Sequence, residues 1–357
     1  MPSSVRIDLA LTLVEASRFP TVIWKRFAIL QAEAIARGLD EPYLHARLAE
    51  SQCLLARVTG NMDQATSSLE YVSMDGTLST VDKRIHSAAG HIAIQHALNR
   101  IQVEDVSGAK GLLADWDCLG QPSPIEEVVL FRKHLITGRA LRFQGDFTNS
   151  LAHLQQSQTI MERSKILNFN EDRRDLVCEH ADTLRELDQC VPAEQCLRAE
   201  LARQESEEIS PHAQVLIKLS LAESLFGQER FREAEELCLA VESCPTLLKF
   251  EKLRLNIIMA KIRHVLESDL ESALSYWNKA LAVLGKFNMT NGRTTRILVL
   301  SICDILIRQG QDWLVHESMK QVRSLDAMAK PGGVMFWIAG TKHWIEYLDS
   351  RGLRSRT

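Results

Sequence analysis

Three histidines at five-residue intervals, His86, His91 and His96, form the most suggestive group of metal ligands in this sequence of 357 residues. A protein zinc site needs three or four ligands that converge on one point. On an α-helix, a five-residue step turns each successive side chain by about 140° around the axis, so three such rings cannot share one face. We therefore expect ordinary surface or half-buried histidines here and no metal site.

A second group, Cys178, His180, Cys190 and Cys196, has the ligand types of a zinc site but lacks the paired spacing. Cys190 and Cys196 fall where helices are expected to pack, and a small buried thiol packs much as alanine does. The eight cysteines are scattered along the chain, which is typical of a reducing compartment. We expect these thiols to belong to the core.

Other catalytic signatures are missing from the sequence. It contains no glycine-rich phosphate loop, no His-Glu-x-x-His motif and no nucleophile elbow. Carboxylates abound in stretches such as "EHADTLRELD" (179–188), but an acid–base pair needs burial or a like-charge neighbour to shift its pKa. Such stretches are typical of solvated helix faces. The sequence thus predicts no catalytic residue, no metal and no cofactor.

The charge balance and the apolar segments restrict the partners. With 42 Lys and Arg against 46 Asp and Glu, the chain lacks the basic surplus of a nucleic-acid-binding protein. Asp8 and Glu15 interrupt the apolar residues near the start, unlike a secretory signal. The longest apolar run, 297–307, has 11 residues, whereas a bilayer span needs about 20. We expect a cytoplasmic or nuclear protein with no nucleic-acid or membrane partner, and its oligomeric state stays open.

Helix signals dominate the elements that must position any site. Ser123-Pro124 and Ser210-Pro211 each place a capping hydroxyl before a proline at the first helical position. The Asn-Gly pair at 291–292 lies between two helical patterns rather than between two alternating ones. The chain is predicted to be all-α, with about fifteen helices.

These helices follow a repeat. In "LAESLFGQERFREAEELCLAV" (221–241), Ala222 lies in one helix, Phe231 follows the turn, and Ala234 lies early in a second helix. The second small position recurs at residues 65, 109, 150, 193, 234, 273 and 316, in steps of 44, 41, 43, 41, 39 and 43. The large residue at the turn recurs at Met62, Val106, Phe147, Cys190, Phe231 and Leu270. The late copies depart from the pattern, because Lys261, Asp304 and His316 stand at small positions.

Two antiparallel helices cannot bury an apolar face alone, so such pairs stack on one another. The pattern of Ala222, Phe231 and Ala234 resembles the tetratricopeptide repeat over about residues 40–325, although the signature Trp, Gly and Pro positions are mostly unmet. A step of about 42 residues exceeds the 34 of the standard repeat. It resembles the long variant in MalT-type regulator domains and in the fifth subunit of the anaphase-promoting complex. The resemblance implies a right-handed α-solenoid of about seven antiparallel helix pairs.

The predicted domain organisation places capping helices at both ends of the repeats. Trp337 and Trp344 suit a helix over 334–348 that covers the apolar end of the stack near Ile258 and Ile262. The predicted segments are 1–38 (N-terminal capping helices), 39–328 (repeats), 329–350 (C-terminal capping helix) and 351–357 (flexible tail).

The resemblance also implies that the first helix of each pair lines a concave face along which ligands lie. The predicted partner-binding residues on that face are Arg57, Arg139, Arg142, Arg185, Glu223 and Phe226. Arg139 and Arg142, three residues apart, would hold a peptide carboxylate through forked hydrogen bonds. The alternative is a solvated face with salt bridges to Asp182 or Glu186. If the site is real, reversing both arginine charges should weaken binding with little change in melting temperature.

Three functions remain open from the sequence. The first is a non-enzymatic scaffold or adaptor that binds a protein or peptide partner through its concave face, as a subunit of a larger complex. The alternative is a helical-repeat enzyme or effector-binding domain that holds a small apolar molecule in the groove, or in a cavity closed by the C-terminal helix. An enclosed apolar cavity would favour the second, and an open trough would favour the first. The third is a regulator of the MalT kind, whose repeats bind an effector and whose partner domain would lie elsewhere.

Overall fold

The computed structural model consists of α-helices and one short 3-10 turn, with no strand among the residues it describes. These residues are 5, 22–36, 41–59, 61–70, 82–103, 105–118, 120–164, 170–207, 209, 211–266, 269–286, 292–328 and 341–353. The predicted all-α, helical-repeat fold is confirmed. None of the helices within these ranges is long and apolar enough to span a membrane.

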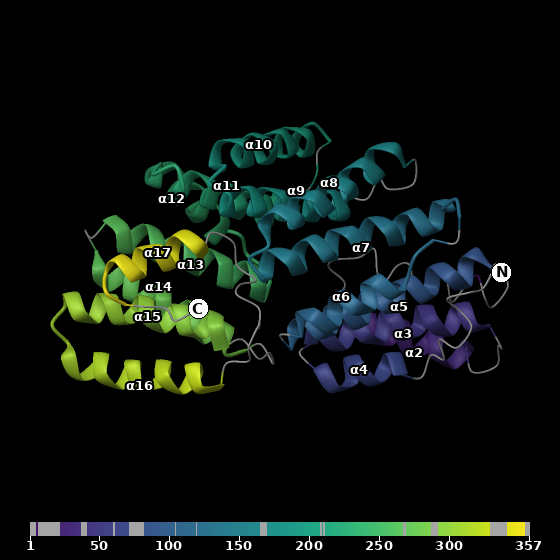
Figure 1. Cartoon of the computed structure of the whole chain (residues 1–357), viewed down its shortest axis with the longest axis horizontal. Helices are drawn as coiled ribbons and strands as arrows, with labels where there is room; N and C mark the ends of the chain where they lie inside the picture. The colour runs from purple at the N-terminus through teal and green to yellow at the C-terminus, as the bar shows by residue number, and fades with distance from the viewer. Residues whose placement is uncertain are drawn as a thin grey trace. The chain divides into compact units, whose positions relative to one another are not determined.

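The chain divides into two compact units. Unit 1 comprises residues 1–137, 162–166 and 288–290, and unit 2 comprises the rest. The helices described in unit 1 are α2 (Val22–Ala36), α3 (Pro42–Thr59), α4 (Met62–Glu70), α5 (Lys83–Gln102), α6 (Val106–Asp115) and the first part of α7 (Pro124–Phe143). Within this unit, α3 packs on α4 and α5 packs on α6, as Figure 1 shows.

Unit 2 contains the remaining helix pairs. They are the end of α7 with α8 (Phe147–Arg163), α9 (Asn170–Glu186) with α10 (Cys190–Ser206), α11 (Val215–Phe226) with α12 (Phe231–Glu242), α13 (Lys249–Leu266) with α14 (Leu270–Leu284), and α15 (Gly292–Arg308) with α16 (Asp312–Met328). The 3-10 turn Pro211–Gln214 precedes α11, and a last helix, α17 (Thr341–Ser350), follows the pairs (Figure 1).

The second helix of each of the first six pairs begins at the large residue that the repeat pattern placed at the turn. These first residues are Met62, Val106, Phe147, Cys190, Phe231 and Leu270. Side-chain caps support some of these starts: Asp105 accepts a hydrogen bond from the Gly108 amide at 2.9 Å, and Asp269 accepts one from the Ser272 amide at 2.9 Å. The predicted joints are therefore confirmed.

The small residues of the repeat lie where the two helices of a pair meet. All six second-helix positions are 0% exposed: Ala65, Ala109, Ser150, Ala193, Ala234 and Ala273. At Gly138 of α7, an added Cβ would lie 2.9 Å from Leu154 and 3.2 Å from the Ser150 carbonyl oxygen. Backbones that approach this closely leave no room for larger side chains.

The predicted register of the late copies is wrong by one residue. Ala260 and Cys303, each 0% exposed, hold the first-helix small positions that were assigned to Lys261 and Asp304. In α16, His316 is exposed while Val315 packs into the core. The seventh copy has no alanine at the second-helix small position, so the sequence contained no marker of register there.

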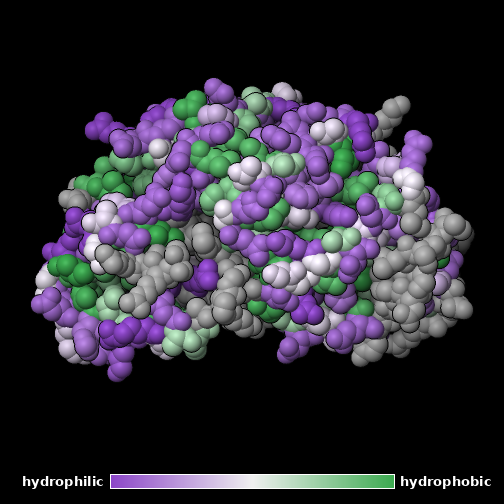
Figure 2. Space-filling view, in the orientation of Figure 1, coloured by the Kyte–Doolittle hydropathy of each residue, from purple (hydrophilic) through white to green (hydrophobic). Residues whose placement is uncertain are grey.

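The predicted terminal segments are described only in part. Within 1–38, the predicted N-terminal capping helices, the structure describes α2, while residues 1–4, 6–21 and 37–38 lie outside the described residues. In the C-terminal cap, α17 includes Trp344, whereas Trp337 and residues 354–357 also lie outside. The predicted domain boundaries stay a prediction. On the face shown in Figure 2, hydrophobic residues form patches interrupted by hydrophilic ones.

Gly90 of α5 marks a close approach between helices in unit 1. A Cβ added there would lie 2.4 Å from Val129 and 2.6 Å from the ring of Trp116. We predict that Gly90→Ala lowers the free energy of unfolding by about 1–3 kcal/mol through overpacking, although alanine favours a helix. Urea denaturation followed by circular dichroism would measure it. The control is Gly111→Ala in α6, where nothing lies within 4 Å of the new methyl group and a small gain is expected. Equal effects of the two changes would contradict the packing argument.

Candidate functional site

The three regularly spaced histidines contact different neighbours. The His86 Nδ1 atom lies 2.7 Å from Glu126 Oε1, and its ring stacks on Trp116 at a centroid distance of 5.0 Å. The His91 Nδ1 atom lies 3.7 Å from Glu50 Oε1. Within the described part of the chain, no group of three His, Cys, Asp or Glu side chains is arranged to hold a metal ion.

The environment of His91 makes unit 1 sensitive to acid. Burial, together with the charges of Arg132 and Arg47, lowers the pKa of His91 to about 4, although Glu50 acts in the opposite direction. An unfolded histidine binds its proton near pH 6.5, so acidification between pH 6.5 and 4 favours the unfolded chain.

We predict a stability loss from His91 of at most about 2 kcal/mol between pH 7 and pH 5. Urea denaturation at several pH values would show this loss as a slope. The His91→Gln variant should show a shallower slope than the parent over this pH range. Identical slopes would show that His91 does not contribute.

The cysteine group does not form a site either. Burial raises the pKa of Cys196 to about 11 and that of Cys178 further, so both thiols are protonated at neutral pH. Cys178 is buried, and Cys190 and Cys196 are half-buried within the helix pair α9 and α10. These residues therefore pack in unit 2, as predicted.

The most unusual feature of unit 2 is a set of buried ionic side chains on successive first helices. We call it the charged ladder. Its residues come from α7 (Arg139, Arg142), α9 (Glu179, Asp182, Arg185), α11 (Glu223) and α13 (Arg254). All except the half-buried Arg139 are less than 9% exposed. A buried charge is stable only when an opposite charge or a hydrogen-bond partner lies close to it. The ladder is therefore described by the partners of each charged side chain.

The ladder begins with two arginines on one carboxylate. The Arg139 Nε atom donates to Glu179 Oε1 at 2.7 Å, and Arg142 Nη2 donates to Glu179 Oε2 at 2.9 Å. Arg142 Nη2 also lies 3.9 Å from Asp182 Oδ2. The two arginines are one turn apart on α7, so a single carboxylate on α9 bridges them.

Asp182 is the centre of the ladder. Arg254 Nη2 donates to Asp182 Oδ1 at 2.7 Å, Ser220 Oγ donates to the same oxygen at 2.9 Å, and Arg185 forms a further ion pair with it. Arg185 and Arg254 also reach Glu223 Oε2, at 2.8 and 2.7 Å. Three helix pairs are thus joined through one carboxylate.

The arginines keep Asp182 ionised. Burial would raise the pKa of Asp182, but Arg254, Arg185 and Arg142 outweigh it and hold the pKa well below the usual range. Asp182 and Glu223 stabilise the Arg254 cation and raise its pKa, although burial acts in the opposite direction. Asp182 therefore supplies fixed negative charge and does not exchange a proton near neutral pH.

One end of the ladder has unused hydrogen-bond donors. The Arg142 side chain is 2% exposed, and its Nε and Nη1 atoms have no hydrogen-bond partner among the described residues. Its guanidinium lies over the Phe143 ring at 4.9 Å. Counted over the ladder residues, four arginines face three carboxylates. A buried guanidinium with free donors beside a cationic surplus is suited to an anionic group.

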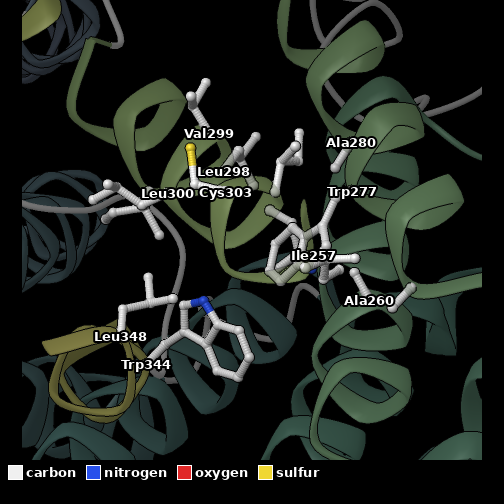
Figure 3. Packing of buried hydrophobic residues seen from close by; sticks show 14 of the residues in the cluster. Ile257, Ala260, Trp277, Ala280, Leu298, Val299, Leu300, Cys303, Trp344 and Leu348 are labelled. Carbon is white, nitrogen blue, oxygen red and sulfur yellow. The ribbon is translucent and has the colours of Figure 1, made fainter. Parts of the chain in front are cut away.

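The second feature of unit 2 is α17, which contacts the C-terminal parts of first helices such as α9 and α13. Its Trp344 is 3% exposed and donates from Nε1 to Ser301 Oγ at 2.8 Å. We call the surrounding residues the α17 seat: Phe226, Lys261, His264, Trp277 and Ser301. Figure 3 shows Trp344 and Leu348 on α17, with Trp277, Ile257 and Ala260 opposite. Trp344 packs in one core cluster with Ile257 and Ala260, whereas Ile258 and Ile262 belong to another cluster, so the predicted cover of those two residues stays a prediction.

The seat residues His264 and Trp277 belong to a cluster of buried polar groups. His264 Nδ1 accepts a hydrogen bond from Trp277 Nε1 at 3.1 Å, and its Nε2 lies 2.8 Å from Asp304 Oδ2. Because Trp277 can only donate, the His264 proton must be on Nε2, which donates to Asp304. Arg308 pairs with the same carboxylate at 2.6 Å and also reaches the Tyr347 hydroxyl of α17.

The six predicted site residues fall into two units, with Arg57 in unit 1 and the other five in unit 2. Their role in partner binding stays a prediction. Arg57 donates to Asn99 at 3.0 Å and to Gln95 at 2.5 Å. Arg142, Arg185 and Glu223 are buried in the ladder, so the interpretation of a solvated face is wrong for them. The two that remain, Arg139 and Phe226, are half-buried, and Phe226 packs on Trp344 at a ring distance of 6.4 Å.

Glu179 and Arg254 are ladder residues that the sequence reasoning did not select. The sequence contained no marker for these two residues, but it did mark their neighbours, because the residue after each first-helix small position is charged from the third copy onward. These residues are Arg139, Asp182, Glu223, Lys261 and Asp304. In the corrected register, Lys261 and Asp304 belong to this charged series rather than to the small one.

No model of a known protein family matches the sequence, and no curated protein matches it. Among solved structures, the chain is similar to a Rap protein complexed with Competence and Sporulation Factor, with a TM-score of 0.56, 11% identity, and coverage of 87% of this chain and 88% of that one. It is also similar to the apo form of RapI, with a TM-score of 0.52, 10% identity, and coverage of 93% and 99%. These likenesses support a tetratricopeptide-like helical-repeat fold. Neither bears on the long-repeat variant, which stays a prediction.

Proposed function

We propose that the chain is a non-enzymatic helical-repeat protein that binds a protein or peptide partner on the first-helix face of unit 2. The observation that carries this proposal is the end of the charged ladder. There the partly exposed Arg139 lies beside Arg142, whose buried Nε and Nη1 atoms have no hydrogen-bond partner among the described residues. An acidic side chain or a C-terminal carboxylate of the partner would supply the missing anion. The similar Rap protein was solved as a complex with Competence and Sporulation Factor, which is in keeping with a binding role for this fold.

The alternative, an effector-binding or enzymatic role with a small apolar molecule, stays a hypothesis without a specific observation in its favour. The aromatic seat near the C-terminal end is filled by Trp344 of the chain itself. A cytoplasmic or nuclear location and the absence of a nucleic-acid partner likewise stay predictions.

The burial of Arg142 changes how the proposal must be tested. Reversal of its charge would place a third carboxylate beside Glu179 and Asp182 in the core, so the expectation of an unchanged melting temperature does not hold for Arg142. Arg139 is the better position because its side chain is 25% exposed.

Site-specific photo-crosslinking in the cells of origin would test the proposal. A photoreactive amino acid is placed at Asp175, two turns before Asp182 on α9, and a control at the exposed Glu236 of α12. We expect a crosslinked protein or peptide from position 175 and none from 236. An additional Arg139→Gln change should reduce the crosslink at 175 by about tenfold, as loss of a charge-assisted hydrogen bond would. Crosslinks from 236 alone, or a yield that does not respond to Arg139→Gln, would refute the site.

A further inference from the structure

The contacts of α17 fall into a buried anchor and an exposed rim. The anchor is Trp344, whose ring lies 5.3 Å from His264 and 5.6 Å from Trp277 between centroids. At the rim, His343 Nε2 lies 2.7 Å from Asp188 Oδ1, and Lys342 Nζ lies 3.5 Å from Asp188 Oδ2. These rim side chains are 40–61% exposed, and ion pairs this exposed add little to stability. The hold on α17 therefore depends mainly on its inward-facing side chains: Trp344, Leu348, which is 0% exposed, and Tyr347, whose hydroxyl accepts a hydrogen bond from Arg308.

Removing α17 from its seat without a replacement would be unfavourable in free energy. Lys261 is 4% exposed and lies 5.7 Å from the Trp344 ring, in the geometry of a cation–π contact. Removal of Trp344 would expose the large apolar surface of Trp277 and leave the Ser301 hydroxyl without its donor. A surface that is apolar, aromatic and polar at defined points is typical of a site for an amphipathic helix.

We infer that the α17 seat is the docking site for an amphipathic helix of the partner, and that α17 is an internal competitor for it. This inference rests on the proposed function and specifies the partner's chemistry. The incoming helix carries a tryptophan that donates to Ser301 and basic residues in its first turn that face Glu186 and Asp188. The main-chain amide of Lys342 now donates to Glu186 Oε2 at 3.3 Å, which marks the place of that first turn.

Because α17 belongs to the same chain as the seat, a partner helix needs high affinity to displace it. A tethered segment competes at an effective concentration of about millimolar, so it masks the seat from weak ligands. Variants that loosen α17 should consequently bind an external helix more tightly than the parent does.

A labelled synthetic peptide of residues 341–353 serves as the probe, with the intact chain as receptor. We expect Trp344→Ala in the chain to raise peptide affinity at least about tenfold in fluorescence anisotropy, because the anchor of the competitor is lost. A peptide that itself carries Trp344→Ala should not bind. The rim variant Lys342→Glu keeps the test valid if Trp344→Ala fails to fold. Its new carboxylate would lie beside those of Glu186 and Asp188, and this repulsion, rather than the loss of a weak exposed ion pair, should loosen the first turn of α17 and raise peptide affinity. The control Ser350→Ala should behave as the parent.

Three results would overturn the inference. They are equal peptide affinity in the parent and in both loosened variants, binding of the tryptophan-free peptide, and a parent chain that forms dimers through exchange of α17, which would assign the seat to a second copy. Failure of the crosslinking from Asp175 with a positive peptide result would remove the proposed partner at the ladder but leave a helix-binding seat. The two proposals therefore fail separately.

Discussion

The Asp182→Ala variant is expected to lose about 3–5 kcal/mol of unfolding free energy, because removal of one member of a buried ion network leaves the others uncompensated. Asp182 is 4% exposed and accepts hydrogen bonds from Arg254 and Ser220, in addition to its pair with Arg185. Without it, two guanidinium groups share only Glu223. Guanidinium chloride denaturation followed by circular dichroism would measure the loss.

A second variant separates charge from size at position 182, and a variant on α12 serves as the control. Asp182→Asn keeps the volume of the side chain and removes the charge, so we expect it to show most of the loss. Glu236→Ala, on the exposed face of α12, removes a carboxylate outside the ladder and should change stability by no more than about 0.5 kcal/mol. A loss below about 1 kcal/mol for both Asp182 variants would mean that the ladder is not needed for stability.

The second large effect is expected at Trp277, which is 0% exposed between α13, α15 and α17. Trp277→Ala should lower the free energy of unfolding by about 3–5 kcal/mol, through lost burial and the cavity left behind. Thermal and chemical denaturation would both report it. Because the Trp277 ring lies 5.6 Å from that of Trp344, the same change should also loosen α17.

The hydrogen bond of Trp277 has its own test. Trp277→Phe keeps an aromatic ring but leaves His264 Nδ1 without its donor, so a loss of about 1–3 kcal/mol is expected. The matched control is Trp313→Ala on α16, whose side chain is 72% exposed and should cost no more than about 0.5 kcal/mol. Similar losses for Trp277→Ala and Trp313→Ala would contradict the assignment of Trp277 to the core.

The sequence by itself determined the all-α architecture and the joints of the helix pairs. Turn residues such as Met62 and Phe231 begin second helices, and alanines such as Ala65 and Ala234 are fully buried. Both features are local, since a hairpin fixes which residues of two sequential helices meet. The predicted register slipped in the last two copies, at Lys261, Asp304 and His316, where the sequence has no small residue at the expected position.

Only the tertiary structure decided which charged residues meet. Arg254 pairs with Asp182 across 72 positions of sequence, and Trp344 reaches Ser301 across 43. Such contacts depend on the rotation and shift of each helix pair against the next, which accumulate along the stack and are not set by any single repeat. A charge on the first-helix face therefore has the same sequence pattern whether it faces water, as the sequence suggested for Arg142, or is buried in an ion network, as it is here. Its partner comes from a neighbouring pair whose placement is set by packing, and this is why the charged ladder and the α17 seat required the folded chain.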